Sequence, residues 1–380
     1  GRFNKVANIS GQAMQYHPHG DASIGDALVN LGQKDLLIET QGNWGDVRTG
    51  DDAAAPRYIE ARLSKFALEV AFNAKTTQWQ LSYDGRKNEP VTLPMKFPLL
   101  LAQGADGIAV GLSTKILPHN FCELIEASIK YLRGRKFELY PDFQTGGMID
   151  VTDYNQGKRG GKVKVRAHIE EVDKKTLAIK SVPYGVTTTQ LMDSIVKAND
   201  QGKIKIKKVT DNTAADVEIQ VDLAPGISPD ITIDALYKFT DCETSISPNA
   251  CVIVNLKPDN TRDLLEKELK IKLAELQEKW HYTSLEKIFF EEKIYKELEK
   301  KHETWDKVIE AIDKAFVPFK KQLKREITRE DILKLTEKPV RRIYRLDIDE
   351  LNAQIKGLEA DIKQVKYDIN NLVDFAVAYY

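Results

Sequence analysis

The most regular hydrophobic pattern in the chain lies near its end. Apolar positions between Leu351 and Ala376 alternate spacings of four and three residues, the heptad period of a left-handed coiled coil. These positions are Leu351, Ile355, Leu358, Ile362, Val365, Ile369, Leu372 and Ala376. A looser apolar stripe marks an earlier helix, at Leu265, Leu269, Leu273, Leu276 and Trp280. We predict an antiparallel pair of helices forming a stalk over residues 258–380, with a small helical knob at Ser284–Arg345.

Residues 93–257 have a mixed α/β pattern. Apolar residues alternate with basic ones over residues 163–169, which predicts a strand with one apolar and one basic face. Residues 188–197 have helical spacing, and residues 203–208 repeat the basic and apolar alternation. Two interpretations remain open for these lysines: a cationic surface that grips an anionic partner, or an edge strand that uses lysine to prevent aggregation.

Residues 1–92 predict a compact helical unit with a short strand. We expect a short helix at Ser10–Gln15, then a tight turn, then a second helix at Ala22–Leu31 capped by Asp21. A short buried strand at Leu36–Ile38 and a turn-rich loop at Gln41–Gly45 follow. Helix, turn, helix, strand and loop in this order suggest a winged helix.

The segment Asp51–Lys65 is the most unusual stretch of this first unit. Two acids and three small residues lead to Pro56, which favours an extended loop. From Tyr58 onward we expect a helix, because Tyr58, Arg62 and Lys65 fall at helical spacing. The loop would carry Tyr58 back towards the second helix of the first unit.

Composition limits the classes of protein that fit. The chain has 380 residues, 42% hydrophobic and 30% charged, which is typical of a folded protein of two or three domains. No apolar run could span a bilayer, and three cysteines without CxxC spacing indicate a reduced cytosolic setting. The net charge of −1 requires any nucleic-acid surface to be local. Because Gly1 is not a methionine, we expect a fragment of a longer protein.

Tyr58 and Arg57 are the candidate chemical groups. A tyrosine beside an obligate cation is suited to meet phosphate, and the cation can favour the phenolate that attacks as a nucleophile. His17 and His19 flank Pro18 at the start of the second helix, where helix N–H groups favour phosphate. Metal binding by these two histidines is an alternative, although HxH alone is a weak signal. The sequence contains no GxxxxGK[ST] phosphate loop and no acidic cluster that reads as a magnesium site.

Four ordered motifs carry a family resemblance. They are Tyr16–Asp21 (YHPHGD), Gln41–Gly45 (QGNWG), Ala53–Tyr58 (AAAPRY) and Gly107–Gly111 (GIAVG). Together they resemble the breakage-reunion subunit of bacterial type IIA DNA topoisomerases, the A subunits of topoisomerase IV and DNA gyrase. The short loop before Gln41 favours topoisomerase IV over gyrase. The resemblance implies a winged-helix DNA-cleavage domain at 1–92, truncated at its start. It also implies an α/β tower domain at 93–257 and a coiled coil with an exit-gate knob at 258–380.

The resemblance also implies roles for individual residues. Tyr58 would attack a DNA phosphodiester and keep a 5′-phosphotyrosyl link, with Arg57 as its transition-state partner. Ile108 would be an apolar wedge that bends DNA, although core packing is the simpler alternative. Ala22 and Asp26 match positions that quinolone drugs contact, and Ala22 stands where many relatives have serine. The implied DNA-binding residues are Lys5, His17, His19, Gly20, Asp21, Ser23, Arg48, Ile108, Lys158 and Arg159.

The resemblance implies partners as well. Double-stranded DNA is the expected substrate, and the chain would form a homodimer through winged-helix and exit-gate surfaces. A B subunit would supply ATP hydrolysis and the Mg²⁺ carboxylates in an A2B2 assembly, so that this chain alone binds no metal or cofactor. A bacterial, cytoplasmic, nucleoid-associated location follows. Two alternatives are a non-catalytic architectural DNA-binding protein and a tyrosine recombinase, which needs several dispersed arginines and no stalk.

Overall fold

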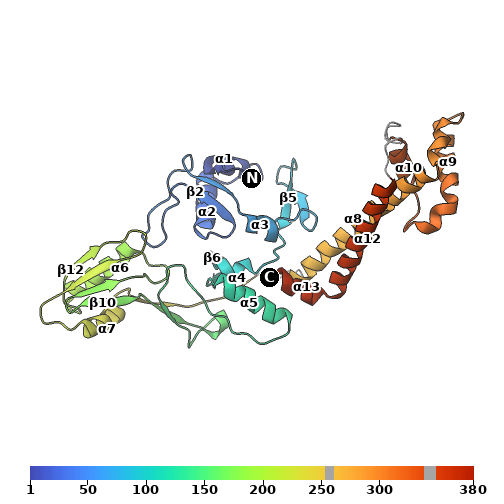
Figure 1. Ribbon diagram of the computed structural model, residues 1–380. Coiled ribbons are helices and arrows are strands. Elements are labelled where there is room, and N and C mark those ends of the chain that lie inside the picture. Colours follow the sequence, from blue (N-terminus) through green and yellow to red (C-terminus); the bar gives the residue numbers. More distant parts are fainter. Residues whose placement is uncertain (253–260, 338–347) are drawn as a thin grey trace. The chain divides into compact units, whose positions relative to one another are not determined.

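The computed structural model describes residues 1–252, 261–337 and 348–380. The chain divides into two compact units, residues 1–258 with Tyr380, and residues 259–379. The predicted boundary at 257/258 and the predicted end of the knob at Arg345 lie outside the described residues. The mixed α/β character predicted for the chain is confirmed: several small sheets and many helices are present (Figure 1).

The first unit begins with two helices and a small antiparallel sheet. The elements are β1 (Asn4–Lys5), α1 (Val6–Ala13), α2 (Asp21–Gln33), β2 (Ile38–Gln41) and β3 (Glu60–Leu63), and the strand order is β1-β3-β2. Their shared core contains Val6, Ile38, Trp44, Ile59 and Ala61. Gly32 of α2 lies directly against the Trp44 indole, since a Cβ added to this glycine would be 2.6 Å from the ring. A glycine at this position therefore lets α2 pack closely against the loop that carries Trp44.

The local details differ from the sequence predictions at three points. The strand predicted at Leu36–Ile38 begins two residues later, as β2 at Ile38–Gln41. The first helix begins at Val6, four residues before the predicted Ser10. Asp21 is the first residue of α2, and the N-cap is Gly20, which provides no side-chain cap. The Asp21 carboxylate instead accepts a hydrogen bond from the Ala22 N–H at 3.0 Å.

The predicted helix at Tyr58–Lys65 is wrong. Tyr58 lies in a turn, and residues 60–63 form strand β3. Ile59 and Ala61 are each 1% exposed while Glu60 and Arg62 are half-buried, which is the alternation of a strand. Pairing of β3 with β1 on one side and β2 on the other fixes this geometry. A helix follows only at α3 (Lys65–Val70), whose N-cap Ser64 accepts a hydrogen bond from the Ala67 N–H.

Two hairpins and two helices follow in the first unit. The elements are β4 (Gln78–Leu81), β5 (Asn88–Thr92), α4 (Leu99–Gln103), β6 (Ala105–Ala109), β7 (Leu112–Ile116) and α5 (Phe121–Leu132). The β6–β7 hairpin contains the glycine-bracketed motif at its tip, where Ile108 pairs with Ser113 across the two strands. Gly111 turns the chain with a φ of 77°, which a glycine adopts without strain.

The remaining sheets of the first unit contain the basic segments. One sheet has the order β14-β9-β8 and the other β10-β11-β13-β12. Their strands are β8 (Met148–Asp150), β9 (Val163–Arg166), β10 (Ile169–Asp173), β11 (Thr176–Ile179), β12 (Ile206–Asp211), β13 (Ile219–Leu223) and β14 (Glu243–Ile246). The helical elements are η1 (Asn155–Gly157), α6 (Thr188–Asp200) and α7 (Pro229–Phe239). The predicted helix at 188–197 is confirmed by α6, and its buried face packs on the second sheet.

The two basic strands have different positions in their sheets. β9 is a central strand, and Val163, Val165 and the following Ala167 are all 0% exposed, so the predicted apolar face is confirmed there. The single strand predicted over residues 163–169 is wrong, however, because β9 ends at Arg166 and Ile169 begins β10 in the other sheet. The second basic strand begins at Ile206, three residues later than predicted, and it is an edge strand. The interpretation of edge lysines therefore fits Lys207 and Lys208 but does not fit β9.

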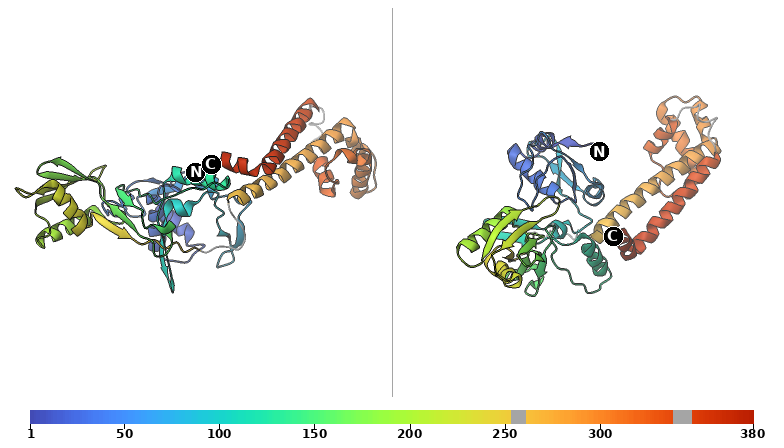
Figure 2. Two further views of the ribbon diagram at one scale, coloured as in Figure 1. Left: turned by 90° about the horizontal axis from the view of Figure 1, so that it is seen from below. Right: turned by 60° about the vertical axis from the view of Figure 1, so that its left-hand side comes forward.

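The second unit is helical throughout its described residues. The elements are α8 (Thr261–Glu291), η2 (Ile294–Glu299), α9 (Trp305–Phe316), η3 (Val317–Gln322), α10 (Arg329–Thr336), α12 (Ile348–Asn370) and α13 (Leu372–Tyr379). Helices α8 and α12 pack side by side along their length in every view (Figures 1 and 2). The two helices are antiparallel: Arg262 at the start of α8 lines one hollow with Asn370 at the end of α12, whereas the Trp280 indole N–H, further along α8, donates to the earlier Glu359 at 3.1 Å.

The predicted seam coincides with the least exposed positions of the returning helices. Leu351, Ile362, Val365 and Ala376 are buried, and the other four seam residues are not fully buried. The seam is not one continuous helix, however, because α12 ends at Asn370 and α13 begins at Leu372. The Asn371 amide donates to the Tyr367 carbonyl at 2.9 Å at this break.

The far end of this unit contains its own core and a polar cluster. Phe289, Ile312 and Phe316 are at most 1% exposed in the core between α8, α9 and α10. Beside it, Asp331 is 4% exposed and accepts hydrogen bonds from both Arg325 terminal nitrogens, at 2.7 and 3.0 Å. Arg325 also donates to both carboxylate oxygens of Glu278 on α8, and so joins α8 to the start of α10.

Candidate functional site

Tyr58 lies on the surface of the first unit, on a turn anchored by its neighbours. The Tyr58 N–H donates to the Ala55 carbonyl at 2.8 Å, and the adjacent Ile59 is buried in the core. The α1 residues Val6 and Ala7 donate backbone hydrogen bonds to Ile59 and Pro56, at 3.1 and 3.0 Å. A rigid backbone therefore presents a side chain that is 63% exposed.

Arg57 covers the Tyr58 ring. The guanidinium carbon lies 4.7 Å from the ring centroid, which is the geometry of a cation–π contact. The contact places a permanent positive charge against a phenol that faces solvent. The two side chains predicted to act together, Arg57 and Tyr58, are therefore in contact, and the tyrosine is exposed to solvent.

The start of α2 lies close to this turn. An ideal Cβ on Gly25 would be 3.7 Å from the Pro56 ring, so α2 packs against the residue that precedes Arg57. The candidate residues on the first turns of α2 and just before it are all exposed; they are His17, His19, Gly20, Asp21, Ala22, Ser23 and Asp26. The structure thus gathers the tyrosine loop and the exposed end of α2 in one small sheet-and-helix unit.

His17 and His19 contact one another. Their ring centroids are 4.6 Å apart at an interplanar angle of 71°, an edge-to-face arrangement, and the His19 N–H donates to the His17 carbonyl at 2.8 Å. Within the described residues, no group of three or more His, Cys, Asp and Glu side chains is placed to hold a metal ion.

Lys5 and Arg48 are both engaged with neighbouring acids. Lys5 forms an ion pair with Glu60 at 2.8 Å. Arg48 binds both carboxylate oxygens of Asp46 and donates to the Ala215 carbonyl at 3.1 Å. The hydrogen bond from Arg48 lowers the pKa of Asp46 against the opposing effect of burial, and the same bond raises the pKa of Arg48. Arg48 therefore connects the loop after Trp44 to the β12–β13 turn.

Ile108 lies far from any core. Its side chain is 91% exposed at the tip of the β6–β7 hairpin, so the alternative interpretation of core packing is wrong. Val110, two residues further on, is 104% exposed and was not among the site residues predicted from the sequence. The signal was present, since residues two apart in an extended segment share a face. Lys158 and Arg159 are exposed in the glycine-rich loop after η1.

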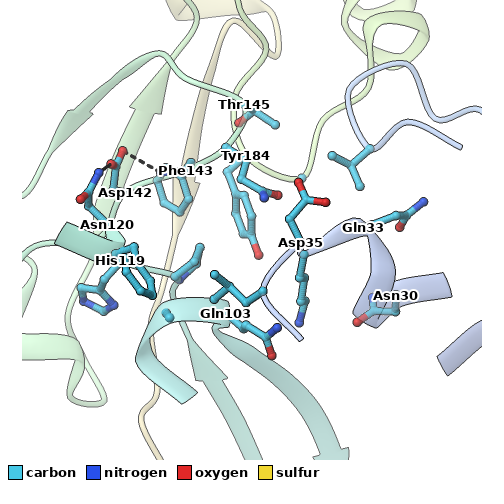
Figure 3. Close-up of a pocket in the computed structure, with 18 residues that line it drawn as sticks. Asn30, Gln33, Asp35, Gln103, His119, Asn120, Asp142, Phe143, Thr145 and Tyr184 are labelled. Atoms are coloured by element: carbon cyan, nitrogen blue, oxygen red, sulfur yellow. Dashed lines mark hydrogen bonds between the residues drawn. The ribbon is translucent and has the colours of Figure 1, made fainter. Parts of the chain in front are cut away.

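The first unit also contains a cavity of about 540 Å³, shown in Figure 3. Its labelled lining includes Gln33 and Asp35 at the end of α2 and the stacked pair Phe143 and Tyr184, whose ring centroids are 4.5 Å apart. Asp142 accepts hydrogen bonds from the Asn120 amide at 3.1 Å and from the Phe143 N–H at 2.9 Å. None of the candidate site residues lines this cavity. The candidate residues therefore lie on the open surface and not in this cavity.

Comparison with known proteins identifies the family. The family model for the A subunit of DNA gyrase and topoisomerase IV matches residues 1–378. The chain therefore belongs to the family of DNA gyrase and topoisomerase IV A subunits. It is similar to the A subunit of DNA topoisomerase 4 from Borreliella burgdorferi, with 41% identity over the whole of this chain and 62% of that protein.

Gyrase relatives are similar over less of the chain or at lower identity. The DNA gyrase A subunit of Lawsonia intracellularis is 34% identical over 73% of this chain and 38% of its own length. That of Metamycoplasma arthritidis is 30% identical over 95% of this chain and 43% of its own length. The chain thus spans about two fifths to three fifths of these relatives. No helix among the described residues is long and apolar enough to cross a membrane.

Proposed function

We propose that this chain is the DNA-cleaving and religating part of the A subunit of a type IIA topoisomerase. The phenolic oxygen of Tyr58 attacks a DNA phosphorus, a bond from that oxygen to phosphorus forms, and the bond to the 3′ oxygen breaks. The phenol gives up its proton, the 3′ oxygen takes one up, and the 5′ phosphate stays on the tyrosine. Reversal of the step reseals the strand, and no external energy is needed because one phosphoester replaces another.

The observation that carries this proposal is the exposed Tyr58 phenol with the Arg57 guanidinium 4.7 Å from its ring centroid. A tyrosine hydroxyl is a weak nucleophile, so its attack needs a charged neighbour, and Arg57 is a fixed cation beside the ring. The same cation can stabilise negative charge that develops on the phosphorus oxygens in the transition state.

The surface around Tyr58 supports DNA as the substrate. His17, His19, Gly20, Asp21 and Ser23 form an exposed helix start beside the tyrosine loop, where backbone N–H groups favour phosphate. Ala22 and Asp26, the expected drug-contact positions, belong to the same exposed face. Residues 1–92 would act as a winged helix on the duplex.

A second set of residues would hold and bend the duplex away from the cleavage point. The exposed Ile108 would insert between base pairs and bend the duplex. The additional contacts between protein and bent DNA would offset the free-energy cost of unstacking the bases. Lys158, Arg159 and Arg48, in a tower at 93–257 and at its border, would hold the DNA arms.

We further propose an assembly in which two copies of this chain form a twofold dimer. Their contacts would be the winged-helix surfaces and the knob at residues 284–345, carried on the antiparallel coiled coil. A partner B subunit would complete an A2B2 complex and supply ATP hydrolysis and the Mg²⁺ ligands. In this assembly the chain's own contribution to the cleavage step would be its tyrosine, its arginine and its DNA-binding groups.

The test combines the whole A subunit with its B subunit, Mg²⁺ and supercoiled plasmid. Denaturation with detergent should release linear DNA with protein attached, and peptide mapping should find the nucleotide on Tyr58. Tyr58→Phe should reduce covalent adducts to background, because the attacking oxygen is gone, while DNA affinity stays within about twofold.

The matched control is Tyr83→Phe, since Tyr83 is exposed to a similar degree, 65% against 63%. That variant should form adducts at the normal rate. Adducts that persist in Tyr58→Phe, or that map to another side chain, would refute the proposal. A wild-type complex that binds DNA without ever forming adducts would favour the architectural alternative.

A further inference from the structure

The ammonium group of Lys5 contacts the backbone of Tyr58. Lys5 is the last residue of β1, and its Nζ donates a hydrogen bond to the Tyr58 carbonyl at 3.2 Å. The same Nζ lies 2.8 Å from a carboxylate oxygen of Glu60. Two acceptors on either side of the buried Ile59 therefore share one cation.

These contacts add to main-chain bonds that hold the rest of the turn. β1 pairs with β3 in the register Lys5 opposite Glu60, and Val6 donates to Ile59 at 3.1 Å. The carbonyl of Tyr58 lies between these main-chain bonds, and a side chain donates to it. The peptide that carries the phenol is thus fixed from α1 and β1, which precede it by some fifty residues.

We propose that Lys5 is a positioning residue for Tyr58 and not a phosphate contact. The inference rests on the proposed cleavage function and deepens it. The charge of Lys5 is matched by Glu60, and its donors point at acceptors of the chain itself. A cation held in this way releases few counterions when DNA binds, whereas a phosphate contact releases nearly one.

The positioning role of Lys5 follows from the exposure of the Tyr58 side chain. Its side chain is 63% exposed and has the Arg57 guanidinium over its ring, so little packing fixes the direction of the phenol. The direction then depends on the backbone, and a displacement of about 1 Å at a reacting atom can reduce a rate by about 100-fold. Lys5 restricts this backbone at the tyrosine itself.

The experiment separates affinity from chemistry in the complex of the whole A subunit, its B subunit, Mg²⁺ and DNA. Binding of a fluorescent duplex is measured at several salt concentrations, and adduct formation is measured in a single turnover. Lys5→Met should slow adduct formation about 10- to 100-fold and leave both the dissociation constant and its salt slope unchanged. Lys5→Arg should restore most of the rate, because a guanidinium can donate to both acceptors.

Two further variants keep the test decisive if Lys5→Met folds poorly. Glu60→Gln leaves the Lys5 bond to the Tyr58 carbonyl, so the rate should fall by no more than about threefold and DNA affinity should not change. Lys65→Met removes another exposed cation seven residues after Tyr58 and should leave adduct formation within about twofold.

Three results would overturn the inference while the cleavage proposal survives. The first is a Lys5→Met enzyme with a normal rate, and the second is a salt slope reduced by about 0.9 in that variant, the value for one lost phosphate contact. The third is tighter DNA binding by Glu60→Gln, which would mean that Glu60 had been screening a phosphate-binding lysine. A wild-type enzyme that forms no adduct on Tyr58 would refute both proposals.

Discussion

Replacement of Asp331 by alanine tests the polar cluster at the far end of the second unit. Asp331 accepts two hydrogen bonds from Arg325 and two from Thr328, from its N–H at 2.9 Å and its hydroxyl at 2.8 Å. Thr328 in turn accepts from the Asp331 N–H at 3.2 Å, which completes a capping box at the start of α10. The substitution therefore removes the half of the capping box that Asp331 provides, together with a buried charge partner, and leaves the bond from the N–H of residue 331 to Thr328.

The expected loss follows from these contacts. Loss of one partner of a buried ion pair costs about 3–5 kcal/mol, and the Thr328 cap itself is retained. The lower end applies, because the Arg325 side chain is 32% exposed and keeps its bonds to Glu278. We expect a total of about 3 kcal/mol, which corresponds to an opening equilibrium raised about 150-fold.

The assay is amide hydrogen exchange of α9 and α10 in the intact chain, which reports local opening directly. The matched control is the adjacent Glu330→Ala, which removes an exposed pair with Lys334 and should cost less than about 0.5 kcal/mol. Equal protection in the two variants would show that the Arg325 cluster contributes nothing to the stability of this end.

The same variant has a defined pH dependence. Burial raises the pKa of Asp331, but hydrogen bonds from Arg325 and Thr328 outweigh it and leave the pKa well below its ordinary value. A depressed folded-state pKa means stabilisation that is present above the unfolded pKa of ~3.9 and lost as the pH falls below it. The difference between wild type and Asp331→Ala should be constant from about pH 7 to 5 and narrow below about pH 4.

Three other changes have defined outcomes. Ile108→Ala should reduce DNA bending in a fluorescence end-to-end assay while Val110→Ala reduces it less; an unchanged bend in Ile108→Ala would refute the wedge. Replacing residues 284–345 by a short linker should weaken the dimer in sedimentation, and an unchanged association constant would contradict an exit gate there. Gly45→Ala should destabilise the first unit by more than about 2 kcal/mol in thermal unfolding, because φ is 75° and a Cβ would lie 2.3 Å from the Asp51 carbonyl. The control Gly11→Ala, on an open face of α1, should stabilise slightly.

The returning helices could be predicted because their signal is local and repeated. Each seam residue adds the same information about one helical face, and the buried positions Leu351, Ile362, Val365 and Ala376 agree with it. The break at Asn371 could not be predicted, since the spacing of apolar residues continues across it. The spacing of hydrophobic residues predicts which face of a helix is buried, but it does not predict whether the helix is continuous.

The turn at Tyr58 was harder to predict from the sequence than the returning helices, because its structure depends on distant residues. The prediction of a helix used the spacing of Tyr58, Arg62 and Lys65, which are polar and carry no information about a buried face. The informative pair was Ile59 and Ala61, two apart and both buried, which indicates a strand. Even so, the partner β1 lies more than fifty residues earlier, and no local pattern names it.

The sequence motifs select the candidate residues but do not reveal the contacts of those residues. The motifs identify Tyr58, Arg57 and the exposed start of α2, and the family match supports the resemblance they carry. The contacts of Lys5 with Tyr58 and Glu60 required coordinates, because they join segments that only the β1–β3 pairing brings together. Ile108 shows the same limit: an apolar run does not reveal whether it faces a core or water.

The hairpin tip also affects how the protein behaves in concentrated solution. Ile108 and Val110 place two branched aliphatic side chains in water, where each would gain about 1.5–3 kcal/mol if something dry covered it. Two chains can supply that cover for one another, so we expect the purified protein to self-associate at this point. A short duplex added during storage should therefore improve solubility, and a polar residue at position 110 should have the same effect without nucleic acid.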